Sequence, residues 1–234
     1  NLKNIFNKNN LKVKKIILKD FIEGAELIKQ NHGIETFFKI KINKDTININ
    51  FFDNSSFRFS QNFNFGSNII LNDISKICSI SHEMINKILS DKILENINSD
   101  SDLLEDKYFV GSNYRKIRKK LFIEIVEARI EEIVQIIFEK NVNIENLIKN
   151  NKVKIYLNIK DEIILKNFKE NFIKFFSKNQ NFEISLFDND KLAKNSSLIN
   201  TIVNLTIYGW KKEAIPITQT KSSLITRIFK SLFD

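Results

Sequence analysis

Hydrophobic and polar residues alternate between Thr36 and Phe52, and this period of two predicts β-strands. The apolar residues at every second position are Phe38, Ile40, Ile42, Ile47, Ile49 and Phe51. The polar residues 43–46 interrupt the alternation, so the pattern predicts a hairpin of two strands joined by a tight turn. Alternate phenylalanines predict a third strand at residues 57–63.

Elsewhere the apolar residues recur with the helical period of 3.6. Helices are predicted at residues 20–30, 68–79, 115–141, 162–177 and 198–210, and one more follows Ser81, which is its expected N-terminal cap. Short apolar runs predict strands at residues 11–18, 153–157 and 182–186. A chain whose strands first form a hairpin and later alternate with helices is of the α/β class.

Residues 222–234 divide cleanly into an apolar and a polar half on a helical wheel. The apolar half holds Leu224, Ile225, Ile228, Phe229, Leu232 and Phe233, and the polar half includes Arg227 and Lys230. Two interpretations are open. The helix packs on its own domain, as most amphipathic helices do, or it lies in a membrane interface, where its basic residues meet anionic lipid headgroups.

Composition and charge exclude few classes of function. The 234 residues are 42% hydrophobic, enough for a substantial core, and carry a formal net charge of +9. The densest basic cluster, residues 114–120, is interpreted as a solvated helix start. A basic nucleic-acid-binding module built on that cluster is an alternative, although no RNA-recognition motif, zinc finger or helix-turn-helix signature is present.

Motifs that carry chemistry are missing from the sequence. It has no glycine-rich phosphate loop, no G-x-S-x-G and no H-E-x-x-H. The single cysteine, Cys78, excludes a disulfide within the chain and a cysteine-based zinc site, and it is expected in the core. The adjacent carboxylates Glu131-Glu132 and Asp161-Glu162 are interpreted as surface charges. No catalytic residue or metal ligand is assigned.

Four stretches of the sequence carry a resemblance to a known family. Phe63–Ile74 is similar to I-P-x-G-G-x-x-[IV]-T-x-D-[IL], and Ile125–Ile133 is similar to I-I-E-A-R-x-E-E-[IL]. Asn200–Gly209 is similar to A-T-A-x-G-L-x-x-Y-G, and residues 211–234 resemble a linker followed by a membrane-targeting tail. In order and approximate spacing, residues 11–234 resemble FtsA, the bacterial actin-like cell-division protein that ties the FtsZ ring to the membrane.

The resemblance implies an α/β, actin-like ATPase (ribonuclease-H-like) lobe with an inserted helical subdomain and a C-terminal amphipathic helix. The resemblance makes this chain the second lobe and places the first lobe upstream, and the start at Asn1 rather than Met fits the C-terminal part of a longer protein. The implied organisation is an inter-lobe strand and helix at 1–33, a core subdomain at 34–66 and 121–210, an inserted subdomain at 67–120, a linker at 211–221 and a membrane-targeting helix at 222–234.

Departures from the family occur where the family binds ATP and Mg²⁺. Its D-I-G-G-G-T corresponds to Lys41–Thr46 here, and its L-T-G-G-G corresponds to Leu157–Asp161. Side chains therefore stand where glycine backbone must approach the nucleotide closely. The implied nucleotide-site residues are Asn43, Lys44, Asp45, Thr46 and Asn158, with Lys44 suited to a phosphate and Asp45 to Mg²⁺. We expect the site to be degenerate, with ATP binding weakened or lost.

The implied role is assembly with an FtsZ-like division protein and attachment of the polymer to anionic lipids of the inner membrane. The family also implies self-association and a place on the cytoplasmic face of the bacterial inner membrane at the division site; no nucleic acid is expected. The expected membrane-binding residues are Leu224, Ile225, Arg227, Ile228, Phe229, Lys230, Leu232 and Phe233. Alternatives are another actin-like scaffold, such as the pilus-assembly type, and an active ATPase.

Overall fold

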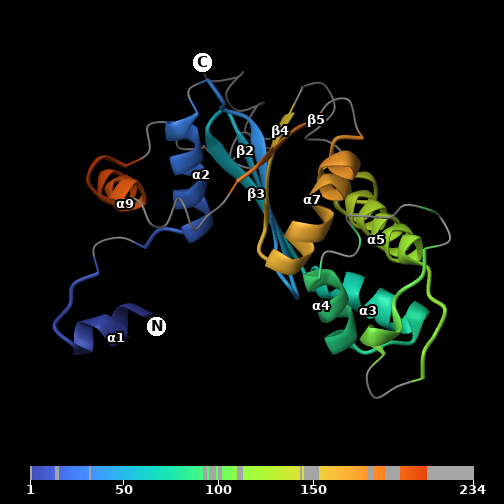
Figure 1. The fold of residues 1–234 in the computed structure, drawn as a ribbon. Helices are drawn as coiled ribbons and strands as arrows, with labels where there is room; N and C mark the ends of the chain where they lie inside the picture. Colours follow the sequence, from blue (N-terminus) through green and yellow to red (C-terminus); the bar gives the residue numbers. More distant parts are fainter. Residues whose placement is uncertain are drawn as a thin grey trace, which may run out of the picture. The chain divides into compact units, whose positions relative to one another are not determined.

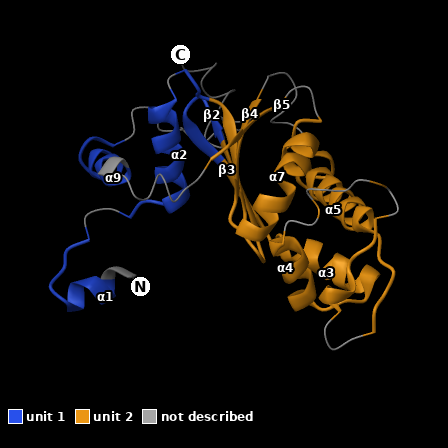
Figure 2. Ribbon diagram, viewed as in Figure 1, with its two compact units in different colours: residues 1–35, 52–58, 195–234 blue, residues 36–51, 59–194 orange. Residues whose placement is uncertain are grey.

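The structure is a computed structural model that describes residues 2–13, 16–31, 33–91, 94, 99, 102–109, 113–142, 144, 153–178, 182–187 and 196–209. These residues fall into two compact units (Figure 2). Unit 1 comprises the described parts of residues 1–35, 52–58 and 195–234, and unit 2 those of residues 36–51 and 59–194. The predicted linker 211–221 and the predicted helix 222–234 lie outside the described residues.

A five-stranded sheet in the order β3-β2-β1-β4-β5 is the centre of the fold (Figure 1). The strands are β1 (Phe37–Ile42), β2 (Ile47–Asp53), β3 (Ser56–Phe63), β4 (Val153–Ile159) and β5 (Phe182–Leu186). β4 runs parallel to β1 with Ile40 opposite Leu157, and β5 runs parallel to β4 with Ile155 opposite Ile184. The predictions of the hairpin, the third strand and the strands at 153–157 and 182–186 are confirmed.

Helices cover one face of this sheet in unit 2. They are α3 (Asn68–Cys78), α4 (His82–Ser90), α5 (Lys119–Val134) and α7 (Glu162–Phe176). Phe38, Ile40 and Ile42 are fully buried in one apolar cluster with α5 and α7, as their alternation predicts. Burial of each such side chain stabilises the fold by roughly 1.5–3 kcal/mol. Figure 1 shows α5 beside α7, which lies next to the sheet.

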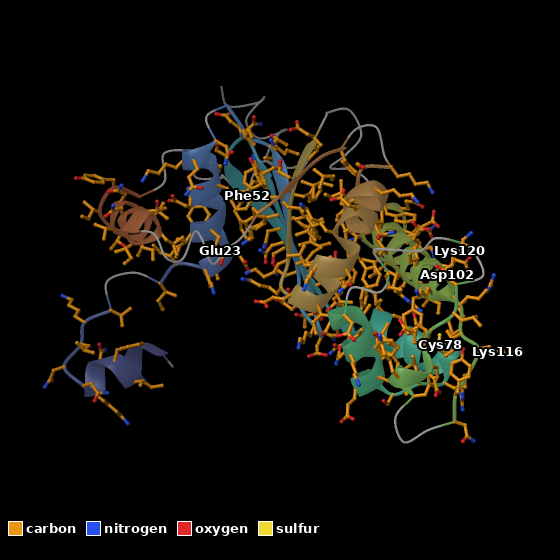
Figure 3. The ribbon with its side chains drawn as sticks, in the orientation of Figure 1. Glu23, Phe52, Cys78, Asp102, Lys116 and Lys120 are labelled. Carbon is orange, nitrogen blue, oxygen red and sulfur yellow. The ribbon has the colours of Figure 1, made fainter. Side chains whose placement is uncertain are left out.

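Unit 1 is built around α2 (Lys19–Gln30) and α9 (Ser196–Tyr208), which pack together, and it also holds α1 (Leu2–Lys8). The buried hydroxyl of Thr201 donates a hydrogen bond to the buried carboxylate of Glu26 and so ties the two helices. Gly24 admits the ring of Phe52, because a Cβ at that position would lie 1.9 Å from its Cζ atom (Figure 3). The predicted helices 20–30 and 198–210 are confirmed.

The predicted strand at 11–18 is wrong for its described residues, which form no strand. Leu11, Ile16 and Leu18 are each more than half exposed, at 58%, 61% and 65%. A run of β-forming residues becomes a strand only where a neighbouring edge accepts its backbone hydrogen bonds. Within the described residues no sheet partner is present for this segment, so its sequence preference does not determine its structure.

The helix predicted at 115–141 is shorter than expected. α5 begins at Lys119 and ends at Val134, and a five-residue π-helical turn, η3 (Gln135–Glu139), follows it. Upstream of α5 the backbone is held by other contacts, since the carbonyl of Ile117 accepts a hydrogen bond of 2.9 Å from the amide of Leu104. These contacts outweigh the helical period of residues 115–118.

The N-terminal cap predicted at Ser81 is confirmed. Its side chain accepts a hydrogen bond from the amide of Met84 at 3.2 Å, at the start of α4. Between α4 and α5, the described residues include one short 3-10 helix, η2 (Asp106–Tyr108). No helix in the described residues is long and apolar enough to span a membrane. The subdomain boundaries implied by the resemblance stay a prediction.

Candidate nucleotide site

The turn between β1 and β2 is closed by its own residues. The amide of Asn43 donates to the carbonyl of Thr46 at 2.9 Å, and the Asn43 side-chain amide donates to Thr46 Oγ1 at 2.9 Å. Lys44, Asp45 and Thr46 are exposed. The structure therefore brings four of the five predicted nucleotide-site residues together in one tight hairpin turn.

The start of α3 lies directly on this turn. The amide of Ser67 donates to the Asn43 carbonyl, and the amide of Asn68 donates to the Lys44 carbonyl, both at 2.9 Å. Gly66 makes the close approach possible, since a Cβ there would lie 2.1 Å from the Asn43 carbonyl oxygen. The contact therefore requires glycine at position 66 for steric reasons, although its φ angle is an ordinary one.

Asp161 connects α3 with the start of α7. One carboxylate oxygen caps α7 by accepting a hydrogen bond from the amide of Ile164 at 3.2 Å. The other accepts a hydrogen bond from the hydroxyl of Ser67 at 2.9 Å. Asp161 is only 4% exposed, so the interpretation of Asp161-Glu162 as a surface pair is wrong for Asp161. Sequence reasoning missed this residue, although Asp before a helical run is a capping signal.

Asn158, the fifth predicted nucleotide-site residue, makes its contact outside the turn at 43–46. It lies in β4 opposite Lys41 of β1 and is buried. Its side-chain amide donates to the carbonyl of Phe187, just beyond β5, at 2.7 Å. Its Oδ1 atom has no hydrogen-bond partner among the described residues. Asn158 therefore tethers the end of β5 to β4, and the structure does not join it to the turn at 43–46.

The two internal motifs that most resemble FtsA meet in unit 2. Arg129, from the E-A-R-x-E-E-like stretch of α5, donates from Nε to the carboxylate of Asp73 in α3 and from Nη1 to Glu132. Asp73 belongs to the stretch that resembles I-P-x-G-G-x-x-[IV]-T-x-D-[IL]. Both side chains of the Arg129–Asp73 pair are about three-quarters buried, at 28% and 20% exposure. This ion pair gives the two motifs a shared structural role.

The basic cluster 114–120 is not a simple helix start. Arg115 donates from Nη1 to the carbonyl of Ser79 at 2.9 Å, just beyond the end of α3, where a cation offsets the negative end of the helix dipole. Figure 3 shows Lys116 at the outer edge of unit 2 and Cys78 further inside. Burial raises the pKa of the Cys78 thiol, which is typical of an unreactive core cysteine.

Comparison with known proteins shows the fold but not the family. No protein-family model matches the chain, and no curated protein matches its sequence. Among solved structures, MreB5 of Spiroplasma citri bound to AMPPNP matches 87% of this chain at a TM-score of 0.50 and 14% identity. The ethanolamine utilization protein EutJ of Carboxydothermus hydrogenoformans matches 78% of this chain, at a TM-score of 0.46 and 14% identity. The chain spans 53% of the length of EutJ and 62% of that of MreB5.

The chain has the actin-like ATPase fold. That result confirms the fold class predicted from the sequence, whereas FtsA itself is not among the matches described above.

The described residues do not fit the phosphate-binding turns that this fold implies. Three positions of the turn carry side chains instead of glycine, and the carbonyls of Asn43 and Lys44 are bound by the start of α3. Asp45 places a carboxylate beside the turn, and Asp161 places another at the N-terminus of α7. These two negative charges would repel a phosphate group. Lys41 stands where the resembled motif has its metal-placing Asp. No cluster of three metal-ligating side chains is present in the described part of the chain.

Proposed function

We propose that this chain is an actin-like assembly protein of the FtsA type, which links an FtsZ-type division polymer to the cytoplasmic face of the bacterial inner membrane. The observation that carries the proposal is the actin-like fold, which MreB5 shares over 87% of this chain. Two further features favour FtsA within that fold. The paired residues Asp73 and Arg129 belong to FtsA-like stretches, and residues 222–234 have a basic amphipathic pattern.

The tail sequence suits weak, reversible membrane attachment. Its six apolar side chains, each partly buried at an interface, contribute roughly 1 kcal/mol apiece. Arg227 and Lys230 add about 1 kcal/mol each near anionic lipid. Ordering the helix removes much of this free energy. A single tail therefore binds weakly, and self-association multiplies the attachment through avidity.

The other candidate functions have less support. A pilus-assembly-type scaffold generally lacks a basic amphipathic tail of this kind. A nucleic-acid module would present residues 114–120 as a free basic surface, but Arg115 is bound to the carbonyl of Ser79. An active ATPase conflicts with the substituted and internally bonded turns at 43–46 and 157–161. Steeply salt-dependent binding to DNA or RNA would favour the nucleic-acid-binding module.

Liposome co-sedimentation tests the membrane half of the proposal. The intact chain is expected to sediment with anionic vesicles and not with neutral ones, and a variant lacking residues 222–234 is expected to remain in the supernatant. Ile228→Glu, on the apolar face, should act like the deletion. Thr226→Ala, on the polar face of the same segment, is the matched control and should bind normally. Equal recovery of the deletion variant with anionic vesicles contradicts the tether.

A further inference from the structure

Three side chains that stand at glycine positions of the resembled motifs form hydrogen bonds within one junction. Asp45 stands at a glycine position of D-I-G-G-G-T, and its carboxylate accepts a hydrogen bond from the Asn68 side chain at 2.7 Å. Ser67 stands at the second glycine of I-P-x-G-G, and Asp161 stands at the last glycine of L-T-G-G-G. These two residues bond each other at 2.9 Å. The substitutions therefore form contacts rather than merely filling space.

The contacts join three elements that are distant in sequence. Ser67 and Asp161 lie 94 residues apart, at the starts of α3 and α7. Both are buried, with exposures of 0% and 4%. The amide of Lys160 donates to the carbonyl of Ile42 at 2.8 Å, so the turn after β4 is also fixed to the end of β1. Hydrogen bonds between protein atoms thus join the hairpin turn, α3 and the start of α7.

We propose that Asp45, Ser67, Asn68 and Asp161 form an internal brace that takes the place of a nucleotide in this lobe. A bound nucleotide stabilises a fold only by contacts made in the folded state. Here the Ser67 hydroxyl and the Asp161 carboxylate make such a contact within the protein itself. The brace makes the conformation of unit 2, and any assembly that depends on it, independent of ATP. This inference concerns regulation of the lobe and does not depend on membrane attachment.

Hydrogen exchange of the intact chain, with and without Mg-ATP or Mg-ADP at millimolar concentration, tests the replacement directly. The brace predicts unchanged exchange at residues 43–46, 66–70 and 160–165, and an unchanged thermal midpoint. Protection of these segments by either nucleotide, or a rise in the midpoint, overturns the inference. Because this arm uses the unaltered chain, it does not depend on any variant folding. It is also separate from the liposome measurement, so either proposal can fail alone.

A double-mutant cycle tests whether the brace is one unit. Ser67→Ala is expected to speed amide exchange at Ile164 about tenfold or more, because it leaves an oxygen of Asp161 buried without a donor. Asp161→Ala should speed exchange at Ser67 and Asn68 in the same way.

The double variant is expected to change the thermal midpoint by less than the sum of the two single changes. Glu162→Gln, at the exposed neighbouring carboxylate, is the matched control and should leave exchange at α3 unchanged. Additive effects, or exchange changes confined to the substituted helix, contradict a shared brace.

Discussion

At the scale of single residues, small changes of side-chain volume and charge decide whether the turn between β1 and β2 can bind a phosphate group. Glycine is kept at Gly66, where the backbone of α3 meets the turn, and is absent at Asn43, Lys44 and Asp45. The sequence, set beside the resembled motif, shows this loss of glycine directly. It could not predict that Asp45 bonds Asn68 or that Ser67 bonds Asp161, because the two residues of each pair lie 23 and 94 positions apart in the sequence.

Gly66→Ala should destabilise the chain through one steric contact. The added Cβ would lie 2.1 Å from the Asn43 carbonyl, so the turn or the start of α3 must shift. We expect the free energy of unfolding in urea to fall by about 1–3 kcal/mol. Asn64→Ala, at an exposed position two residues upstream, is the control and should change it little. A Gly66→Ala chain of unaltered stability would show that α3 does not rest on the turn.

Tyr156 makes the stability of the folded chain depend on pH in the alkaline range. Burial raises the pKa of Tyr156 to about 12, and the nearby carboxylate of Glu183 acts in the same direction. An unfolded tyrosine ionises near pH 10, while the folded one stays neutral. The contribution of Tyr156 to the free energy of unfolding is therefore fully present below about pH 10. It is lost as the pH rises toward 12, because ionisation then favours the unfolded chain. The loss should be smaller in Tyr156→Phe than in the unaltered chain or in the exposed control Tyr114→Phe, measured by urea unfolding from pH 9 to 12.

At the scale of helices and strands, periodicity predicted most of the elements and their order. It found the hairpin, the strands β3, β4 and β5, and the helices α2, α3, α4, α7 and α9. It failed at residues 11–18, whose described residues have no sheet partner, and at residues 115–118, which are held by contacts from outside their own segment. The carbonyl of Ile117, for example, is bound by the amide of Leu104 rather than within a helix. No local pattern contains that information.

The contact between α3 and α5 can be tested through its ion pair. Arg129→Ala and Asp73→Ala should each lower stability, because the first leaves the largely buried Asp73 carboxylate without Arg129 and the second leaves Arg129 paired with Glu132 alone. Combined, the two changes should show a coupling of about 1 kcal/mol in a double-mutant cycle of urea unfolding. The matched control pairs Arg129→Ala with Glu124→Gln, outside this ion pair, and should show additive effects. Additivity for Asp73 and Arg129 would mean that the two FtsA-like stretches do not act together.

At the scale of the whole molecule, the fold is recognisable by shape and barely by sequence. MreB5 superposes at a TM-score of 0.50 with only 14% identity. Buried positions such as Ile40, Ile133 and Phe172 need only be apolar and of suitable volume, so many sequences satisfy the same architecture. The class of fold could therefore be predicted from patterning and resemblance. The role of the tail could not, because an amphipathic pattern suits a membrane and a protein surface equally well.

The most direct measurement of the central claim is recruitment of fluorescent FtsZ-type polymers to anionic vesicles by this chain, without added nucleotide for the chain itself. We predict that polymers concentrate on the vesicles with the intact chain and with Thr226→Ala, and remain in solution with the variant lacking residues 222–234. Vesicles that carry the chain but gather no polymer would contradict the FtsA-type role and leave a membrane-binding scaffold of another kind. Polymer recruitment that persists without residues 222–234 would contradict the tether itself.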